Sequence, residues 1–125
     1  MIIARRTEGL TAELKVRNHI LTSGVVESLG GLDEGMNPHE LLESALAACT
    51  IITVQMYANR KGIKLISTDV NIKILSEGAE TRIGREVSFT GDLTSEERTK
   101  LAEIANKCPI HKLLESHIQI ETTIK

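Results

Sequence analysis

The longest periodic run of apolar residues lies at residues 37–62, NPHELLESALAACTIITVQMYANRKG. Asn37 is a favourable N-cap, Pro38 suits the first helical position, and Gly62 follows a basic pair where helices often end. The pattern predicts one helix of about 36 Å, at 1.5 Å per residue. At about 100° per residue, one stripe centred on Cys49 collects Leu42, Ala45, Leu46, Cys49, Ile52, Thr53 and Met56. We therefore expect the Cys49 thiol to point inward.

Small side chains surround Cys49 on this helix. Ser44, Ala45, Ala47 and Ala48 leave little bulk there, so another backbone can approach closely. The helix is also long for a domain of this size. A second copy of the chain is therefore a natural partner for this helix. Cys49 itself could equally be a small core residue without a chemical role, like the alanines beside it.

Alternating apolar residues before this helix predict strands. Residues 2–6, 11–17 and 19–22 alternate or run apolar and are separated by turn-forming residues, which is typical of a β-meander. Residues 23–37 contain four glycines and no strong periodicity. We expect them to form a loop that leads the chain to the helix start.

The pattern after the long helix changes twice. Residues 68–75 and 82–93 alternate and are joined by SEGAET, which predicts a β-hairpin. Thr94 or Ser95 then caps a second helix whose apolar stripe is Leu101, Ile104 and Ala105. A break at Cys108-Pro109 precedes a short third helix, and residues 118–124 alternate as a last strand. The order βββ-α-ββ-αα-β predicts a single α+β domain over residues 1–125.

Composition narrows the class of protein. The chain has 125 residues and 41% apolar content, with Tyr57 and Phe89 as its only aromatic residues, so its core must be aliphatic. The net charge of −2 and scattered basic residues do not indicate binding to nucleic acid or to a membrane. The N-terminal residues lack the apolar segment of a secretory signal, and the apolar stretch 45–54 is short for a bilayer. We expect a soluble, cytoplasmic protein.

The two cysteines have different local settings. In a reducing cytosol they are more typical of free thiols or a redox pair than of a permanent disulfide. If Cys108 caps the short helix, its sulfur faces unpaired backbone N–H groups, with Lys107 and Lys112 near in sequence, and its pKa should fall. Cys49 has no such help and could react only if the fold brings a cation to it. Local reasoning therefore favours Cys108 as the thiolate.

A metal site is the alternative use of these residues. Cys108 and His111 are three residues apart and could bind zinc with Cys49 and a fourth ligand. Structural zinc sites usually show a second close pair such as CxxC, and this sequence has none. We expect neither a metal nor another cofactor.

Three segments together resemble a known family. The segment GMNPHELLESALAACT with MYANRKG, the segment LTSEERTKLAEIANKCPIHKLL and the alternating C-terminus are similar to the OsmC/Ohr family, the osmotically induced protein C and organic hydroperoxide resistance proteins. The likeness covers nearly the whole chain in order. It is nearest to the short OsmC-like branch.

The resemblance implies an intertwined homodimer in which antiparallel β-sheets from both chains surround two long central helices. It implies that Cys49 is the peroxidatic cysteine and Cys108 the resolving one. The family holds the first thiol ionised with an arginine and a glutamate. His39 fills the usual glutamate position, so Glu40 is the acidic candidate, and Arg6 or Arg17 of the meander, or an arginine of a partner chain, would supply the cation.

Helix geometry limits the acidic candidates. Glu40 lies about 13 Å along the helix from Cys49, at 1.5 Å per residue, and on the opposite side. It would have to act across the dimer, through a bent helix start or through an arginine. Glu43 also lies off the stripe. Both carboxylates could instead be a solvated face with a favourable charge at the helix N-terminus.

The resemblance implies a function as well. The sequence leads us to expect a thiol-dependent peroxidase that reduces organic hydroperoxides in oxidative or osmotic stress. Cys49 would become a sulfenic acid, Cys108 would form a disulfide with it, and a lipoyl-type or thioredoxin-like dithiol would restore both thiols. The alternative is a non-enzymatic protein that binds a small apolar ligand or senses oxidation with the same cysteines.

Overall fold

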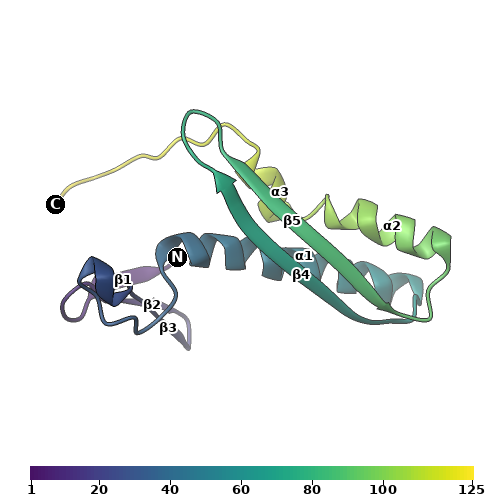
Figure 1. Ribbon diagram of the computed structural model, residues 1–125, viewed down its shortest axis with the longest axis horizontal. Coiled ribbons are helices and arrows are strands. Elements are labelled where there is room, and N and C mark those ends of the chain that lie inside the picture. Colours follow the sequence, from purple (N-terminus) through teal and green to yellow (C-terminus); the bar gives the residue numbers. More distant parts are fainter. The chain divides into compact units, whose positions relative to one another are not determined.

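The N-terminal part of the chain is a small antiparallel sheet followed by a loop. In the computed structural model, contacts divide residues 1–125 into two compact units, Met1–Leu42 and Glu43–Lys125. In the first unit β1 (Ile3–Arg6), β2 (Ala12–Val16) and β3 (His19–Ser23) pair in sequence order (Figure 1). The β-meander is therefore confirmed, whereas the single domain stays a prediction.

The glycine-rich loop is folded back on itself before the helix. It contains the short 3₁₀ helix η1 (Glu27–Leu29). The Ser23 hydroxyl and the Gly24 N–H both donate to the Met36 carbonyl oxygen, at 2.8 and 3.4 Å. A Cβ atom at Gly35 would lie 2.1 Å from the Thr22 oxygen, so this closure requires glycine.

The long helix α1 (Pro38–Lys61) has the predicted ends. Its start is a capping box, because the Glu40 N–H donates to Asn37 Oδ1 and the Asn37 N–H donates to Glu40 Oε1, both at 2.9 Å. Gly62, at φ 66°, follows the last helical residue, a conformation that costs glycine little.

The buried face of α1 differs from the predicted stripe. The fully or nearly fully buried residues are Leu46, Thr50, Val54 and Ala58, spaced by four. Of the predicted stripe only Leu46 is among them, and Leu42, Ile52 and Met56 are exposed. The stripe centred on Cys49 was therefore wrong for the isolated chain. Apolar residues occupy several sides of this helix, and the hairpin and α2 pack on the side that includes Thr50.

The second unit packs a hairpin and two helices against α1. Strands β4 (Leu65–Ser76) and β5 (Arg82–Gly91) pair antiparallel, followed by α2 (Ser95–Ala105) and α3 (Pro109–Leu114). Figure 1 shows the hairpin running along α1, with α2 and α3 following it in the chain. The buried core consists of Val54, Ala58, Leu101 and Ala105. An α+β fold with antiparallel sheets is thus confirmed.

The C-terminal segment contradicts the sequence prediction. Residues 118–124 form no strand, and Ile118, Ile120 and Ile124 are 51%, 86% and 87% exposed. Alternation gives a segment one apolar face, but a strand also needs backbone partners, and this chain supplies none for it. The predicted last strand is therefore wrong for the chain by itself.

Candidate active site

Cys108 lies at the N-terminus of α3, as predicted. Its backbone is extended, at φ −64° and ψ 140°, and Pro109 occupies the first turn of the helix. The His111 N–H donates to Cys108 Sγ at 3.3 Å, which is the capping contact. The cysteine is completely buried. A short sequence, Cys-Pro-Ile-His, therefore fixes this thiol against backbone N–H groups.

Cys49 lies on α1 beside this buried thiol. Its side chain is hydrogen-bonded to Cys108, and its sulfur is 3.9 Å from the Thr53 hydroxyl. Cys49 is only partly buried, whereas Cys108 is not exposed at all. The fold therefore joins two free thiols from distant parts of the sequence, of which one can meet solvent.

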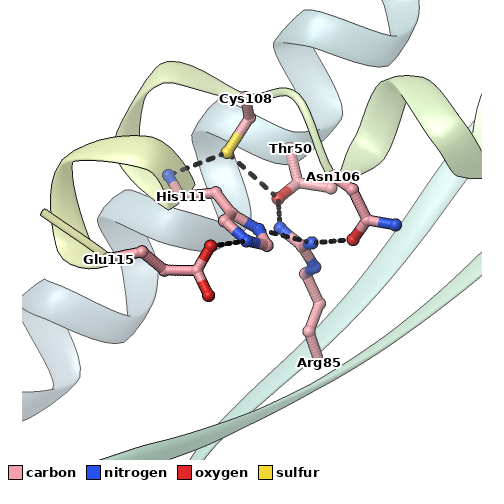
Figure 2. Close-up of polar contacts among 6 residues, drawn as sticks. All are labelled: Thr50, Arg85, Asn106, Cys108, His111 and Glu115. Carbon is pink, nitrogen blue, oxygen red and sulfur yellow. Dashed lines mark hydrogen bonds and ion pairs between the residues drawn. The ribbon is translucent and has the colours of Figure 1, made fainter.

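Arg85 of β5 is the centre of the polar contacts beside Cys108 (Figure 2). Its Nη1 donates to the Thr50 hydroxyl at 3.1 Å, and its Nη2 donates to Asn106 Oδ1 at 2.8 Å and contacts His111 Nδ1 at 2.9 Å. His111 Nε2 lies 2.7 Å from Glu115 Oε1. Because a guanidinium only donates, His111 accepts at Nδ1 and its ring proton on Nε2 is directed to Glu115.

Thr50 lies between the arginine and Cys108. Its hydroxyl is completely buried, donates to the Leu46 carbonyl oxygen at 2.7 Å and lies 3.9 Å from Cys108 Sγ. One hydroxyl thus separates the Arg85 guanidinium from the Cys108 sulfur.

The electrostatic setting favours a charged Cys108. Burial raises the pKa of this thiol, but hydrogen bonds from the His111 N–H and from the side chains of Cys49 and Thr50, with the positive charge of Arg85, more than offset it. The net result is a Cys108 pKa below the usual value of a thiol. The predicted direction is therefore confirmed, with Arg85 as an additional cause.

The other predicted site residues have local roles in the N-terminal unit. Arg6 belongs to β1 and its Nη1 donates to the Gly9 oxygen at 3.4 Å. Arg17 forms the β2–β3 turn with φ 52°. Glu40 closes the capping box of α1. Their participation in catalysis stays a prediction.

Glu43 has a specific partner. Its Oε2 accepts a hydrogen bond from the Ile74 N–H of β4 at 3.1 Å. That N–H lies at a register irregularity of the hairpin between Ile74 and Ser76. The carboxylate therefore ties α1 to β4, and for Glu43 the alternative of a purely solvated side chain is wrong.

Sequence reasoning missed Arg85, Thr50 and Asn106 as members of this cluster. A signal existed for Arg85, because it shares the period of two that places Ile83, Val87 and Phe89 on the inner face of the hairpin. An arginine at an inward position needs a partner, which marks it for attention. Thr50 gave no signal, since it differs little from the small residues around it.

The side chains here do not suit a metal. No group of three or more His, Cys, Asp and Glu side chains is placed to hold a metal ion. Cys108 instead accepts a hydrogen bond from the His111 N–H, and His111 Nδ1 contacts Arg85. The site is defined by two thiols and a guanidinium.

The fold and the site together define the class of protein: an α+β chain with a pair of thiols at its site. The family model for OsmC-like proteins matches residues 31–123, so the chain belongs to the OsmC-like family. The resemblance seen in the sequence is confirmed. A search of curated proteins finds no significant match.

Solved structures share this fold at low sequence identity. An OsmC-like protein from Mycoplasma pneumoniae has a TM-score of 0.78 at 20% identity, over 92% of this chain and 86% of that one. The organic hydroperoxide resistance protein OsmC of Legionella pneumophila has a TM-score of 0.66 at 21% identity, over 92% and 89%. The organic hydroperoxide resistance protein OhrB of Bacillus subtilis has a TM-score of 0.63 at 18% identity, over 92% and 89%.

Helix α1 is long and apolar enough to cross a membrane by length and composition alone. The helix extends well beyond the apolar stretch at residues 45–54. The central helix of a soluble protein meets the same criterion. A single helix of this kind is weak evidence for a membrane span, and here Val54 and Ala58 of α1 pack in the core with Leu101 and Ala105.

Proposed function

We propose that this protein is a thiol-dependent peroxidase that reduces organic hydroperoxides. The observation that carries the proposal is the contact between Cys49 and Cys108, with the first partly exposed and the second buried and linked to Arg85 through the Thr50 hydroxyl. Two related folds carry the description organic hydroperoxide resistance protein. A paired-thiol site in this family can perform peroxide reduction without any cofactor.

The proposed reaction divides the work between the two thiols. The Cys49 thiolate attacks the terminal peroxide oxygen, an S–O bond forms, and the O–O bond breaks to release an alkoxide that is protonated to the alcohol. The Cys108 thiolate then attacks the Cys49 sulfur, forming the disulfide and releasing hydroxide, which becomes water. A dithiol reduces the disulfide by two thiol exchanges and is itself oxidised to a disulfide.

The proposal includes a homodimer in the cytoplasm. Leu42, Ile52 and Met56 on α1 are 41%, 57% and 60% exposed around the half-buried Cys49, and the C-terminal isoleucines are exposed as well. A second copy that covers this face would surround Cys49 with aliphatic groups, which favours alkyl peroxides over hydrogen peroxide. Sedimentation at micromolar concentration should show twice the chain mass, and a single species of 13.7 kDa would contradict the dimer.

The decisive experiment is steady-state consumption of tert-butyl hydroperoxide with dihydrolipoamide or thioredoxin as the reductant. An enzyme consumes many equivalents, whereas an oxidation sensor or a ligand-binding protein stops after the thiols are oxidised. We expect Cys49→Ser to abolish consumption and Cys108→Ser to allow one turnover that stops at the sulfenic acid. If Cys108→Ser fails to react with the peroxide while Cys49→Ser still reacts, the two cysteines have the opposite roles. Hydrogen peroxide under the same conditions serves as the comparison substrate.

A further inference from the structure

Cys108 caps a short helix that lies outside the main core. Helix α3 has six residues, and none of them is buried. The core cluster and the side chains packed against it include no residue of α3. A helix of this length is not stable in water by itself, because its nucleation costs more free energy than so few turns return. The position of α3 therefore depends on its contacts with the rest of this unit.

The Cys108 sulfur lies between α3 and α1 (Figure 2). The His111 N–H of α3 is 3.3 Å from this sulfur, and the Thr50 hydroxyl of α1 is 3.9 Å from it. Cys108 is completely buried, whereas Cys49 is partly exposed. A movement of α3 away from α1 would therefore open Cys108 to solvent.

His111 links the cap of α3 to the arginine. Its backbone N–H donates to the Cys108 sulfur, and its ring Nδ1 accepts from Arg85 Nη2 at 2.9 Å. Arg85 in turn donates to Thr50 of α1 at 3.1 Å and to Asn106 after α2 at 2.8 Å. One imidazole thus joins α3 to a guanidinium that is already bound to α1 and to the end of α2.

Glu115 determines which nitrogen of His111 accepts. Its Oε1 lies 2.7 Å from His111 Nε2, and Figure 2 shows the ring between this carboxylate and the guanidinium. A neutral imidazole carries one proton, so a carboxylate that holds it on Nε2 leaves the lone pair of Nδ1 for Arg85. The side chains of His111 and Glu115 are 25% and 74% exposed. These contacts therefore lie at the surface, where α3 can open without unfolding of the core.

We propose that Arg85 and Glu115, acting through the His111 imidazole, hold α3 closed over Cys108. Peroxides and external thiols then meet Cys49, and Cys108 reacts from inside the protein as the resolving thiol; this role rests on the proposed peroxidase function. Arg85, His111 and Glu115 are positioning residues, because they act on Cys108 through the placement of α3.

Access to Cys108 is measured in the reduced Cys49→Ser protein, where it is the one remaining thiol. The rate of alkylation by iodoacetamide is followed against pH: the midpoint of the profile reports ionisation of the thiol, and the plateau at high pH reports access. In this background His111→Leu should raise the plateau roughly ten-fold or more, the effect expected from losing a hydrogen bond to a charged group. His111→Asn should stay near the starting rate, because the asparagine oxygen can accept in place of Nδ1.

Matched variants separate this contact from a general disturbance of α3. Lys112→Leu changes an exposed residue of the same helix and should leave the plateau unchanged. Arg85→Met should raise the plateau, and the double variant with His111→Leu should be no faster, since both changes remove the same bond. Equal plateaus in His111→Leu and His111→Asn, or a double variant in which the two effects multiply, would overturn the proposal.

Urea separates the opening of α3 from unfolding of the protein. Local opening exposes little surface, so the plateau rate of His111→Leu should hardly change at urea concentrations below the unfolding transition. A rate that rises steeply with urea would contradict the proposal, because Cys108 would then become accessible only by global unfolding. Should His111→Leu fail to fold, Glu115→Leu replaces it, with an expected increase of about two- to five-fold because exposed pairs contribute little. Glu115→Gln keeps an acceptor and is its control; equal rates in these two variants would also count against the proposal.

The consequence for the reaction is tested with tert-butyl hydroperoxide. The same Cys49→Ser proteins are mixed with excess peroxide, and oxidation of Cys108 is followed by mass spectrometry. One opening admits both reagents, so His111→Leu should speed oxidation and alkylation by the same factor at the same pH. Oxidation that stays at the starting rate while alkylation accelerates would refute control of peroxide access by α3. If the protein with both cysteines consumes no peroxide at steady state, the peroxidase function fails, while the plateau rates still judge how α3 is held.

Discussion

Replacement of Thr50 by valine tests the link between Arg85 and Cys108. The two side chains have nearly the same shape, so Thr50→Val removes a hydroxyl from a completely buried position without creating a cavity. It deletes the acceptor for Arg85 Nη1 at 3.1 Å and the polar group 3.9 Å from Cys108 Sγ. The Leu46 carbonyl oxygen loses only a second partner, because the helix still supplies a backbone N–H.

The expected loss of stability follows from these contacts. A hydrogen bond to a charged group contributes about 1.5–3 kcal/mol, but Arg85 is only partly buried and water can replace some of the lost contact. We therefore expect the free energy of unfolding to fall by about 1–2 kcal/mol. The pKa of Cys108 should rise as well, because the Thr50 side chain lowers it in the native protein.

Urea unfolding followed by circular dichroism measures the first effect at one fixed protein concentration, since the stability of an oligomer depends on concentration. A pH titration of thiolate absorbance measures the change in the pKa of Cys108. Thr53→Val is the matched control, because that hydroxyl lies on the same helix and contacts only the Cys49 sulfur, at 3.9 Å. An unfolding free energy and a thiolate titration both equal to wild type in Thr50→Val would refute the argument.

Three further predictions concern the core and the pH dependence. Leu101→Ala should lower the free energy of unfolding by about 2–5 kcal/mol in urea titrations, because Leu101 is completely buried in the core; a loss below about 1 kcal/mol would mean that the core rearranges to fill the space. Thr68→Val should raise the free energy of unfolding by about 1 kcal/mol, because Thr68 Oγ1 is buried without a hydrogen-bond partner; destabilisation in the same titration would show that the hydroxyl is bonded. The lowered pKa of Cys108 means that the folded protein binds fewer protons than the unfolded chain between the folded pKa and the ordinary thiol pKa of about 8.5. Stability from this group should therefore be fully present above about pH 8.5 and be lost as the pH falls through the folded pKa, and urea midpoints across that window should lose this slope in Cys108→Ser.

Local rules in the sequence were sufficient for most element boundaries. Asn37 and Gly62 mark the ends of α1 because a side-chain cap and a left-handed glycine act within one turn of the helix. Cys108 followed by Pro109 predicted both the start of α3 and the direction of the thiol pKa for the same local reason. The strands of the meander and the hairpin followed from a period of two, which depends only on which face is apolar.

Local rules could not predict which side of α1 is buried or which cation lies near the thiols. Apolar residues lie on several sides of α1, so periodicity allowed a stripe through Cys49, whereas packing against the hairpin and α2 selected the side with Thr50 and Val54. Arg85 lies 23 residues before Cys108 in the numbering, and its contact with Thr50 exists only because β5 packs beside α1.

Resemblance to a family identified Cys49 and Cys108, and the structure brought them into contact. The sequence by itself determined the elements as far as α3, the cysteine at the cap of α3 and membership of the family, because each depends on residues close together or in a fixed order. Only the tertiary structure decided that Arg85 supplies the nearby charge and that residues 118–124 have no strand to pair with. Those outcomes depend on contacts between distant segments, and the free energy of such contacts is set by packing and charge in three dimensions.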